Sequence, residues 1–232
     1  MGKIWAIASG SGGVGKTTIA LSLAVGAAHK SLKTILLDAS GISRSCDLLL
    51  GIESVMTFDL LDALSEQTDI GKVLYPAAQC DNLLLTNVSI HESVSLTEFS
   101  GAILALQSMC DVLVVDLPTG IVSIEKKVWT AQDELIVVLR PDDASIRSTE
   151  RLIQQMRGSS VGISLVLNHV RKDRVKKGLQ YTQDAVCMML DCPVLCSISE
   201  DDGCILEIGS GKAVHAATKI GSPVKEMITK LI

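Results

Sequence analysis

Short apolar runs, each fitting one strand, alternate along the chain with segments long enough for a helix. This rhythm is typical of βαβ units, in which helices join parallel strands. We therefore predict an α/β fold, a doubly wound and mostly parallel sheet of about seven or eight strands with helices on both faces. The predicted strands are 4–8, 34–38, 82–86, 111–116, 134–139, 161–168 and 194–198.

The composition supports this class of fold. Hydrophobic residues make up 47% of the chain and aromatic residues only 3%, as expected of Val/Ile/Leu-rich strands covered on both faces. The 232 residues can bury a sizeable core and no linker interrupts them, so we expect a single domain over 1–232. The net charge of −5 argues against a surface devoted to nucleic acid, although a local basic patch stays possible.

The N-terminus and the thiols indicate a cytoplasmic protein. Met1, Gly2 and Lys3 lead straight into the first strand, which leaves no room for a signal segment, and no apolar run is long enough for a membrane span. Seven cysteines, an odd number, fit reduced thiols. Four of them gather at 187, 192, 196 and 204, where a metal site is possible, but the lack of a C-x-x-C pair favours small buried side chains.

A glycine-rich stretch follows the first predicted strand and leads directly into a helical pattern. This is the context of a phosphate-binding loop, in which glycines let backbone amides point inward at the positive end of a helix. Lys16 can then reach the terminal phosphates, and the Thr17 hydroxyl can bind the Mg²⁺ that bridges them. The alternative, a turn that binds nothing, is disfavoured because the spacing, lysine and hydroxyl all agree. The predicted nucleotide-contacting residues are Gly10, Ser11, Gly12, Gly13, Val14, Gly15, Lys16, Thr17 and Thr18.

Two carboxylates end predicted strands at one edge of the sheet. Asp116 ends the most apolar strand, so its carboxylate can meet the shell of a magnesium ion. Asp38 ends the strand after the first helix and can hold a metal-bound water. Each could instead be a helix cap or turn residue, but the phosphate loop favours the functional interpretation. We predict Lys16, Asp38 and Asp116 as catalytic residues and Thr17, Asp38 and Asp116 as the metal site.

Asn168 ends another predicted strand at the same edge. Its amide offers a donor and an acceptor together, so it can contact an adenine base. The alternative is a turn-forming asparagine.

Motifs lie along nearly the whole chain: residues 10–18, Leu37 and Asp38 followed by 44–51, which begins with Arg44, then 115–120, 140–142 and Asn168, then Ser199, Glu200 and Asp201, and finally 221–224. Together they resemble the MinD/ParA family of P-loop ATPases, also called deviant Walker A ATPases. The segment 38–51 is most similar to the MinD branch, which includes the flagellar-number regulators. The resemblance implies ATP and Mg²⁺ as ligands, an ATP-dependent homodimer, a protein partner that stimulates hydrolysis, and the positioning of division sites, flagella, plasmids or other cargo.

Two positions depart from the pattern of this family. The family loop carries a lysine that reaches across the dimer to the partner's phosphates, and this chain has Ser11 there. The family also carries an aspartate near the attacking water, and this chain has Ser40. Because the loss of one such group typically costs about 10²–10³ in rate, we expect weak hydrolysis.

Two further patterns have alternative interpretations. Apolar residues at i, i+3, i+4 and i+7 within 224–231 could form a membrane-binding stripe, but packing of a final helix on the sheet fits better. Five Lys or Arg residues between 171 and 177 could bind DNA, or could form the solvated start of a helix. Neither membrane nor DNA binding is favoured.

The sequence as a whole predicts a MinD-like ATPase that dimerises with nucleotide and regulates position or assembly, with slow hydrolysis. The alternative is an ATP-binding scaffold that has lost hydrolysis and acts as an interaction protein. Ser11 and Ser40 favour the alternative, whereas Lys16, Thr17 and Asp116 support nucleotide binding under both hypotheses.

Overall fold

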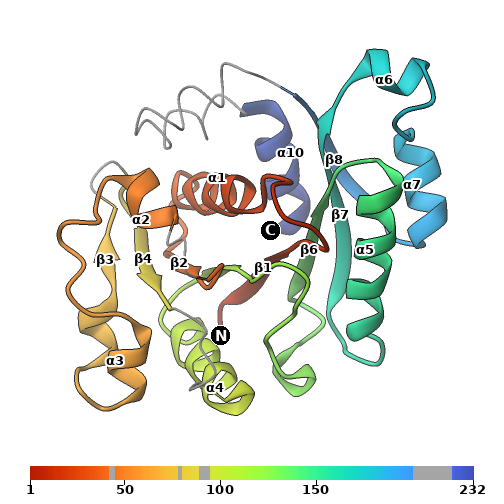
Figure 1. The fold of residues 1–232 in the computed structure, drawn as a ribbon. Helices are drawn as coiled ribbons and strands as arrows, with labels where there is room; N and C mark the ends of the chain where they lie inside the picture. Colours follow the sequence, from red (N-terminus) through yellow and green to blue (C-terminus); the bar gives the residue numbers. More distant parts are fainter. Residues whose placement is uncertain (42–44, 78–79, 89–94, 201–220) are drawn as a thin grey trace.

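The computed structural model describes residues 1–41, 45–77, 80–88, 95–200 and 221–232. Of the residues named above, Arg44, Asp201 and Cys204 lie outside these ranges. The described strands form one eight-stranded sheet in the order β3-β4-β2-β5-β1-β6-β7-β8, with helices on both faces (Figure 1). The predicted fold class is therefore confirmed.

All seven predicted strands are present and pair in parallel with one another. The eighth strand, β3 (Tyr75–Pro76), pairs antiparallel with its neighbour at the edge of the sheet. Two residues that end in proline form no apolar run, so the hydrophobic pattern did not predict this strand. The other strands are β1 (Lys3–Ala8), β2 (Thr34–Asp38), β4 (Leu83–Asn87), β5 (Val112–Asp116), β6 (Glu134–Leu139), β7 (Gly162–Val170) and β8 (Val194–Ser199).

The core is divided into two apolar clusters, one on each face of the sheet. The helices α1 (Lys16–Ala28), α2 (Ser45–Leu50) and α10 (Gly221–Leu231) contribute to one cluster. The helices α3 (Leu60–Leu64), α4 (Leu96–Gln107), α5 (Asp143–Gln155) and α7 (Gln183–Leu190) contribute to the other. The remaining elements are α6 (Lys172–Lys176) and two short 3₁₀ helices, η1 (Ile70–Val73) and η2 (Lys126–Val128).

The apolar stripe of the last helix packs on the domain, as predicted. Val224, Met227 and Ile228 are buried in the same cluster as α1. The two helices approach so closely that a Cβ atom on Gly26 would lie 2.2 Å from Cδ1 of Ile228. This stripe therefore stabilises the fold. In the part of the chain that the structure describes, no helix is long and apolar enough to cross a membrane.

The parallel register gathers the predicted site residues at one edge of the sheet. Asp116 on β5 is the register partner of Asp38 on β2 and of Ile7 on β1. The segment after each of these strands therefore starts at the same edge, where ligands bind in folds of this type.

Candidate functional site

The loop between β1 and α1 forms one wall of a cleft. Gly15 is the N-cap of α1 in the left-handed conformation, with φ 87°, and no side chain caps the helix. The first backbone amides of α1 are therefore available to an anion. The cleft has a volume of about 260 Å³ and is lined by Ser9, Gly13, Val14, Gly15, Lys16, Thr17, Thr18, Ser40 and Thr119. Of the predicted nucleotide-contacting residues, Gly10, Ser11 and Gly12 belong to the same loop but not to this lining.

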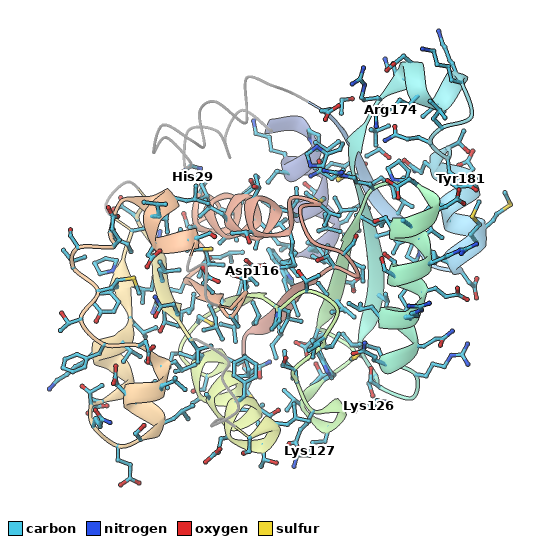
Figure 2. All side chains as sticks on the ribbon, viewed as in Figure 1. His29, Asp116, Lys126, Lys127, Arg174 and Tyr181 are labelled. Atoms are coloured by element: carbon cyan, nitrogen blue, oxygen red, sulfur yellow. The ribbon has the colours of Figure 1, made fainter. Side chains whose placement is uncertain are left out.

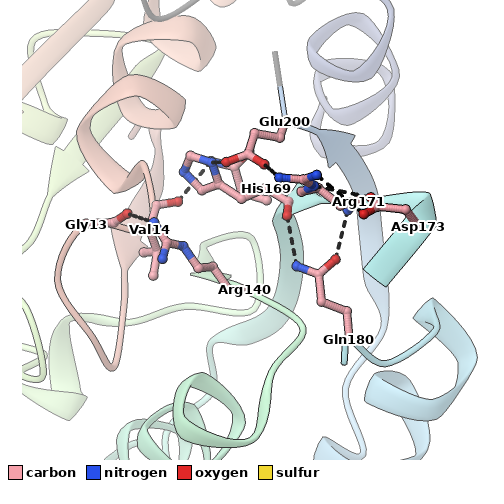
Figure 3. Close-up of polar contacts among 9 residues, drawn as sticks. Gly13, Val14, Arg140, His169, Arg171, Asp173, Gln180 and Glu200 are labelled. Carbon is pink, nitrogen blue, oxygen red and sulfur yellow. Dashed lines mark hydrogen bonds and ion pairs between the residues drawn. The ribbon is translucent and has the colours of Figure 1, made fainter. Parts of the chain in front are cut away.

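Two side chains, one on β7 and one directly after the neighbouring β6, donate hydrogen bonds to backbone carbonyls of the loop (Figure 3). Nδ2 of Asn168, on β7, donates to the carbonyl oxygen of Val14 at 2.9 Å. Nη2 of Arg140, directly after β6, donates to the carbonyl oxygen of Gly13 at 3.0 Å. A Cβ atom on Gly15 would lie 2.3 Å from Nδ2 of Asn168, so both the backbone conformation and the space require glycine there.

Lys16, Thr17 and Asp116 meet at the base of the cleft. Nζ of Lys16 lies 2.5 Å from Oδ1 of Asp116, and the Thr17 hydroxyl donates to Oδ2 of the same carboxylate at 2.6 Å. The Lys16 side chain is 8% exposed and Asp116 is fully buried. Asp116 lies at the centre of the molecule, close beneath α1 in the view of Figure 2.

Burial raises the pKa of the Asp116 carboxyl, while Lys16 and the hydrogen bond from Thr17 oppose this shift. Because burial disfavours the charged form of this carboxylate, a further cation placed beside it would stabilise the ionised form. The buried lysine and the hydroxyl explain why an acidic residue is tolerated at the end of an apolar strand.

Asp38 lies beside Asp116 and is also buried. Its Oδ1 accepts hydrogen bonds from the backbone amide and the hydroxyl of Ser40, at 3.0 and 2.6 Å. Its Oδ2 accepts one from the backbone amide of Cys46 at 3.0 Å. The carboxylate thus holds both Ser40, after β2, and Cys46, the second residue of α2.

The donor atoms around these carboxylates fit a hard divalent cation. One oxygen each from Asp38 and Asp116 lies within 4.8 Å of the other and of Sγ of Cys46. Carboxylate and hydroxyl oxygens are the ligands that Mg²⁺ prefers, whereas a thiol suits softer metals. Burial, reinforced by the two carboxylates, keeps the pKa of the Cys46 thiol well above its usual value, which further disfavours thiolate ligation. The predicted set of Thr17, Asp38 and Asp116 therefore fits Mg²⁺.

Ser11 lies against the segment that follows β6. Its hydroxyl lies 3.2 Å from the hydroxyl of Ser145, on α5. The hydroxyl of Ser9, which lines the cleft, is buried and has no hydrogen-bond partner among the described residues. A buried unpaired hydroxyl at this position is available to a ligand.

The end of β7 is bent beside the phosphate loop. His169 follows Asn168 with φ 55°, and its Nε2 would lie 3.7 Å from a Cβ on Gly15. The buried Gln180 holds this bend, because its amide donates to the carbonyl oxygen of His169 and accepts from the backbone amide of Arg171 (Figure 3). Asn168 therefore reaches the phosphate loop with one end of its amide. Contact of the other end with a base stays a prediction.

Three residues at the site were not among the predicted site residues: Ser9, Thr119 and Arg140. Arg140 carried a usable signal, because it directly follows a predicted strand that ends at the same edge as Asp116. Thr119 lies inside the motif 115–120 without a role predicted for its own side chain, and Ser9 directly precedes the phosphate loop. The fold brings both to the cleft.

Two other features do not mark the site. A larger cavity of about 530 Å³ lies at the opposite ends of β1 and β6, away from the phosphate loop, so cavity size alone does not identify the site. Cys192 and Cys196 are buried in different apolar clusters on opposite faces of the sheet. They cannot share a metal ion, and they behave as the small buried side chains that the sequence favoured.

A mostly parallel sheet with a phosphate loop between β1 and α1, and a buried aspartate at the end of the adjacent β5, defines a P-loop nucleotide-binding protein. Residues 5–214 match the family described as the CobQ/CobB/MinD/ParA nucleotide binding domain. The chain belongs to this family.

The chain is similar to MinD proteins over most of its length. The septum site-determining protein MinD of Synechocystis is 26% identical over 227 residues, which cover 96% of this chain and 85% of that protein. The MinD fold in the MinC:MinD cell division protein complex of Aquifex aeolicus superimposes with a TM-score of 0.82 at 22% identity, covering 99% of this chain and 95% of that one. Pyrococcus horikoshii MinD, complexed with Mg-ADP, gives a TM-score of 0.77 at 22% identity, covering 100% and 94%.

Proposed function

We propose that this chain is a MinD-like ATPase, a nucleotide-dependent regulator of position or assembly that binds ATP with Mg²⁺. The observation that carries this proposal is the buried group of Lys16, Thr17 and Asp116 at the start of an uncapped α1. It supplies a cation for phosphates, an oxygen ligand and a carboxylate in one place. Similarity to MinD proteins supports the biological role.

The residues around the cleft have separate roles in this proposal. The backbone of 10–18 and the Lys16 ammonium bind the phosphates, and Asn168 contacts the adenine base. Thr17, Asp38 and Asp116 hold the Mg²⁺, directly or through water, and the bound ion neutralises charge on the outer phosphates. We expect a single domain over 1–232, with these residues at one edge of its sheet.

We expect hydrolysis to be slow because two polar groups differ from the family pattern. Ser11 carries no charge and lies against Ser145, and the Ser40 hydroxyl donates to Asp38 instead of adding a second carboxylate. The same two residues favour the alternative, an ATP-binding scaffold without useful hydrolysis. Membership of an ATPase family favours the first hypothesis.

We expect the chain to act as an ATP-dependent homodimer with a regulatory protein partner. We expect this to take place in the cytoplasm. The free thiols of the described cysteines, four of them buried, fit a reducing compartment. DNA binding is less favoured. The basic residues of α6 are exposed, but Arg171, directly before α6, pairs with Asp173 and Glu200. Arg174 lies far from Asp116, which marks the nucleotide site (Figure 2). Stable membrane binding is also not favoured, because the apolar stripe of α10 is buried.

Calorimetric titration with Mg-ATP, together with phosphate release, tests the proposal. We expect the wild-type chain to bind Mg-ATP, and Lys16→Ala to lose most of the affinity because its ammonium no longer meets phosphate. Equal affinities of the two proteins would refute the site. Phosphate release that stays at the background of Lys16→Ala, despite binding, would favour the scaffold.

A further inference from the structure

The segment after β6 lies against the phosphate loop at two points. The Ser11 and Ser145 hydroxyls are 3.2 Å apart, and Arg140 donates to the carbonyl oxygen of Gly13. The backbone also packs tightly here, since a Cβ on Gly10 would lie 2.3 Å from the backbone carbon of Ser148. The segment after β6 therefore lies next to Ser11 in the phosphate loop.

Hydrogen bonds fix the position of Arg140 relative to Ser11. The Ser145 hydroxyl, which contacts Ser11, also accepts a hydrogen bond from the backbone amide of Arg140 at 3.1 Å. Ser145 is itself held by Asp142, whose carboxylate accepts from its backbone amide at 2.9 Å. A short chain of bonds thus runs from the uncharged residue of the phosphate loop to the backbone of an arginine.

The Arg140 guanidinium keeps donors and charge available beside Gly13, a residue that lines the cleft. It is exposed and uses one nitrogen for the Gly13 carbonyl, which leaves further N–H groups of its fork for a ligand. Within the described ranges, no carboxylate forms an ion pair with it, and the nearby Glu200 contacts His169 and Arg171. Its positive charge reaches the loop: after burial, Arg140 is the next cause that lowers the pKa of His169, which lies beside Gly15.

We propose that Arg140 supplies the positive charge that stabilises the transferring phosphoryl group, the charge that Ser11 cannot provide. This inference rests on the proposed ATPase function and deepens it. Arginine suits the task because its planar fork is always charged and can bind two phosphate oxygens at once.

The chemical step is the hydrolysis of ATP. A bond forms between a water oxygen and the γ-phosphorus, and the bond from the γ-phosphorus to the β,γ-bridging oxygen breaks, with its electron pair remaining on ADP. One proton of the water stays on the released phosphate and the other passes to solvent. Negative charge on the transferring group is the feature that Arg140 stabilises, and it does so from the same chain that carries the phosphate loop.

The test compares Arg140→Ala, Arg140→Lys and the control Arg151→Ala, which removes an exposed arginine from α5. Two affinities are measured by calorimetry, for Mg-ADP and for Mg-ADP with aluminium fluoride, which imitates the transferring phosphoryl group. Single-turnover phosphate release at saturating ATP is the third quantity. We expect Arg140→Ala to lower the rate and the affinity for the aluminium fluoride complex by about a hundredfold, with little change for Mg-ADP. Arg140→Lys should be intermediate and Arg151→Ala should match the wild type.

Equal losses for Mg-ADP and for the aluminium fluoride complex would overturn the inference, because Arg140 would then only support the loop backbone. Unchanged values for Arg140→Ala would overturn it as well. If the wild-type chain bound neither Mg-ADP nor its aluminium fluoride complex, the proposed function itself would fail. This outcome is distinct from the two above, because in both of them the wild-type chain binds nucleotide.

Discussion

The ammonium group of Lys16 is bonded to the carboxylate of Asp116 at 2.5 Å, although the two residues are 100 positions apart in the sequence. The phosphate-loop motif predicts that this lysine binds phosphate, and the position of this aspartate at the end of β5 predicts that it binds a metal ion. In the structure the two groups neutralise each other inside the core. When Mg²⁺ and phosphate bind, Mg²⁺ therefore competes with Lys16 for the Asp116 carboxylate, and phosphate competes with Asp116 for the Lys16 ammonium, unless each group contacts both partners.

The first prediction follows from the burial of this pair. Lys16→Ala leaves Asp116 buried without its cation, so we expect a loss of about 3 kcal/mol in the free energy of unfolding. The double variant Lys16→Ala with Asp116→Asn removes the unpaired charge and should recover much of that loss. Urea unfolding followed by circular dichroism measures both. A double variant no more stable than Lys16→Ala would mean that the pair does not contribute as described.

The second prediction separates the metal role of Asp116 from its role toward Lys16. Asp116→Asn should remove most of the gain in ATP affinity that Mg²⁺ provides, because a neutral amide is a poorer ligand than a carboxylate. ATP affinity without Mg²⁺ should hold or increase, since Lys16 loses a competing partner. Calorimetry with and without the metal gives both values. Equal loss in the two conditions would show that Asp116 is structural only.

The third prediction contrasts two glycines of one loop. Gly15→Ala should destabilise the protein by more than about 1 kcal/mol, because φ is 87° and the new Cβ would meet Asn168. Gly12→Ala is the matched control: nothing lies within 4 Å of its Cβ position and its φ is not positive. Thermal unfolding of both variants without nucleotide compares them. Similar losses in the two variants would contradict the described contact with Asn168.

The fourth prediction concerns pH. Burial, followed by Arg140, lowers the pKa of His169 below its ordinary value of 6.5, while Glu200 partly opposes the shift. The unfolded chain therefore binds a proton at a higher pH than the native state does, so this residue makes stability fall as the pH decreases below the unfolded pKa. His169→Asn, which tolerates a positive φ, should reduce the drop in melting temperature between about pH 7.5 and about pH 5.5. The exposed His29→Asn is the control, and an identical drop in wild type and His169→Asn would refute the assignment.

The strand pattern and the phosphate loop could be read from the sequence because their signals are local. Strands such as β5 are continuous apolar runs, and 10–18 combines glycine, lysine and hydroxyl spacing within one turn. Strand β3 could not be predicted, since it is held by its neighbour β4 and has no pattern of its own.

The contacts that complete the site join distant segments. Asn168 meets Val14 across 154 positions, and Arg140 meets Gly13 across 127. The sequence placed Asn168 at the correct edge of the sheet but could not indicate that its amide holds the loop. Likewise, Ser40 was recognised as a missing carboxylate, whereas its hydrogen bond to Asp38 depends on how the chain turns after β2.

The central claim is that this phosphate loop makes the chain an ATP-dependent switch, and the molar mass in solution tests it most directly. Light scattering after size exclusion should give the monomer mass of 24.6 kDa with Mg-ADP and twice that mass with Mg-ATP. Lys16→Ala should remain monomeric under both conditions, because its phosphate contact is lost. A wild-type mass that is the same with Mg-ATP and Mg-ADP would contradict the account.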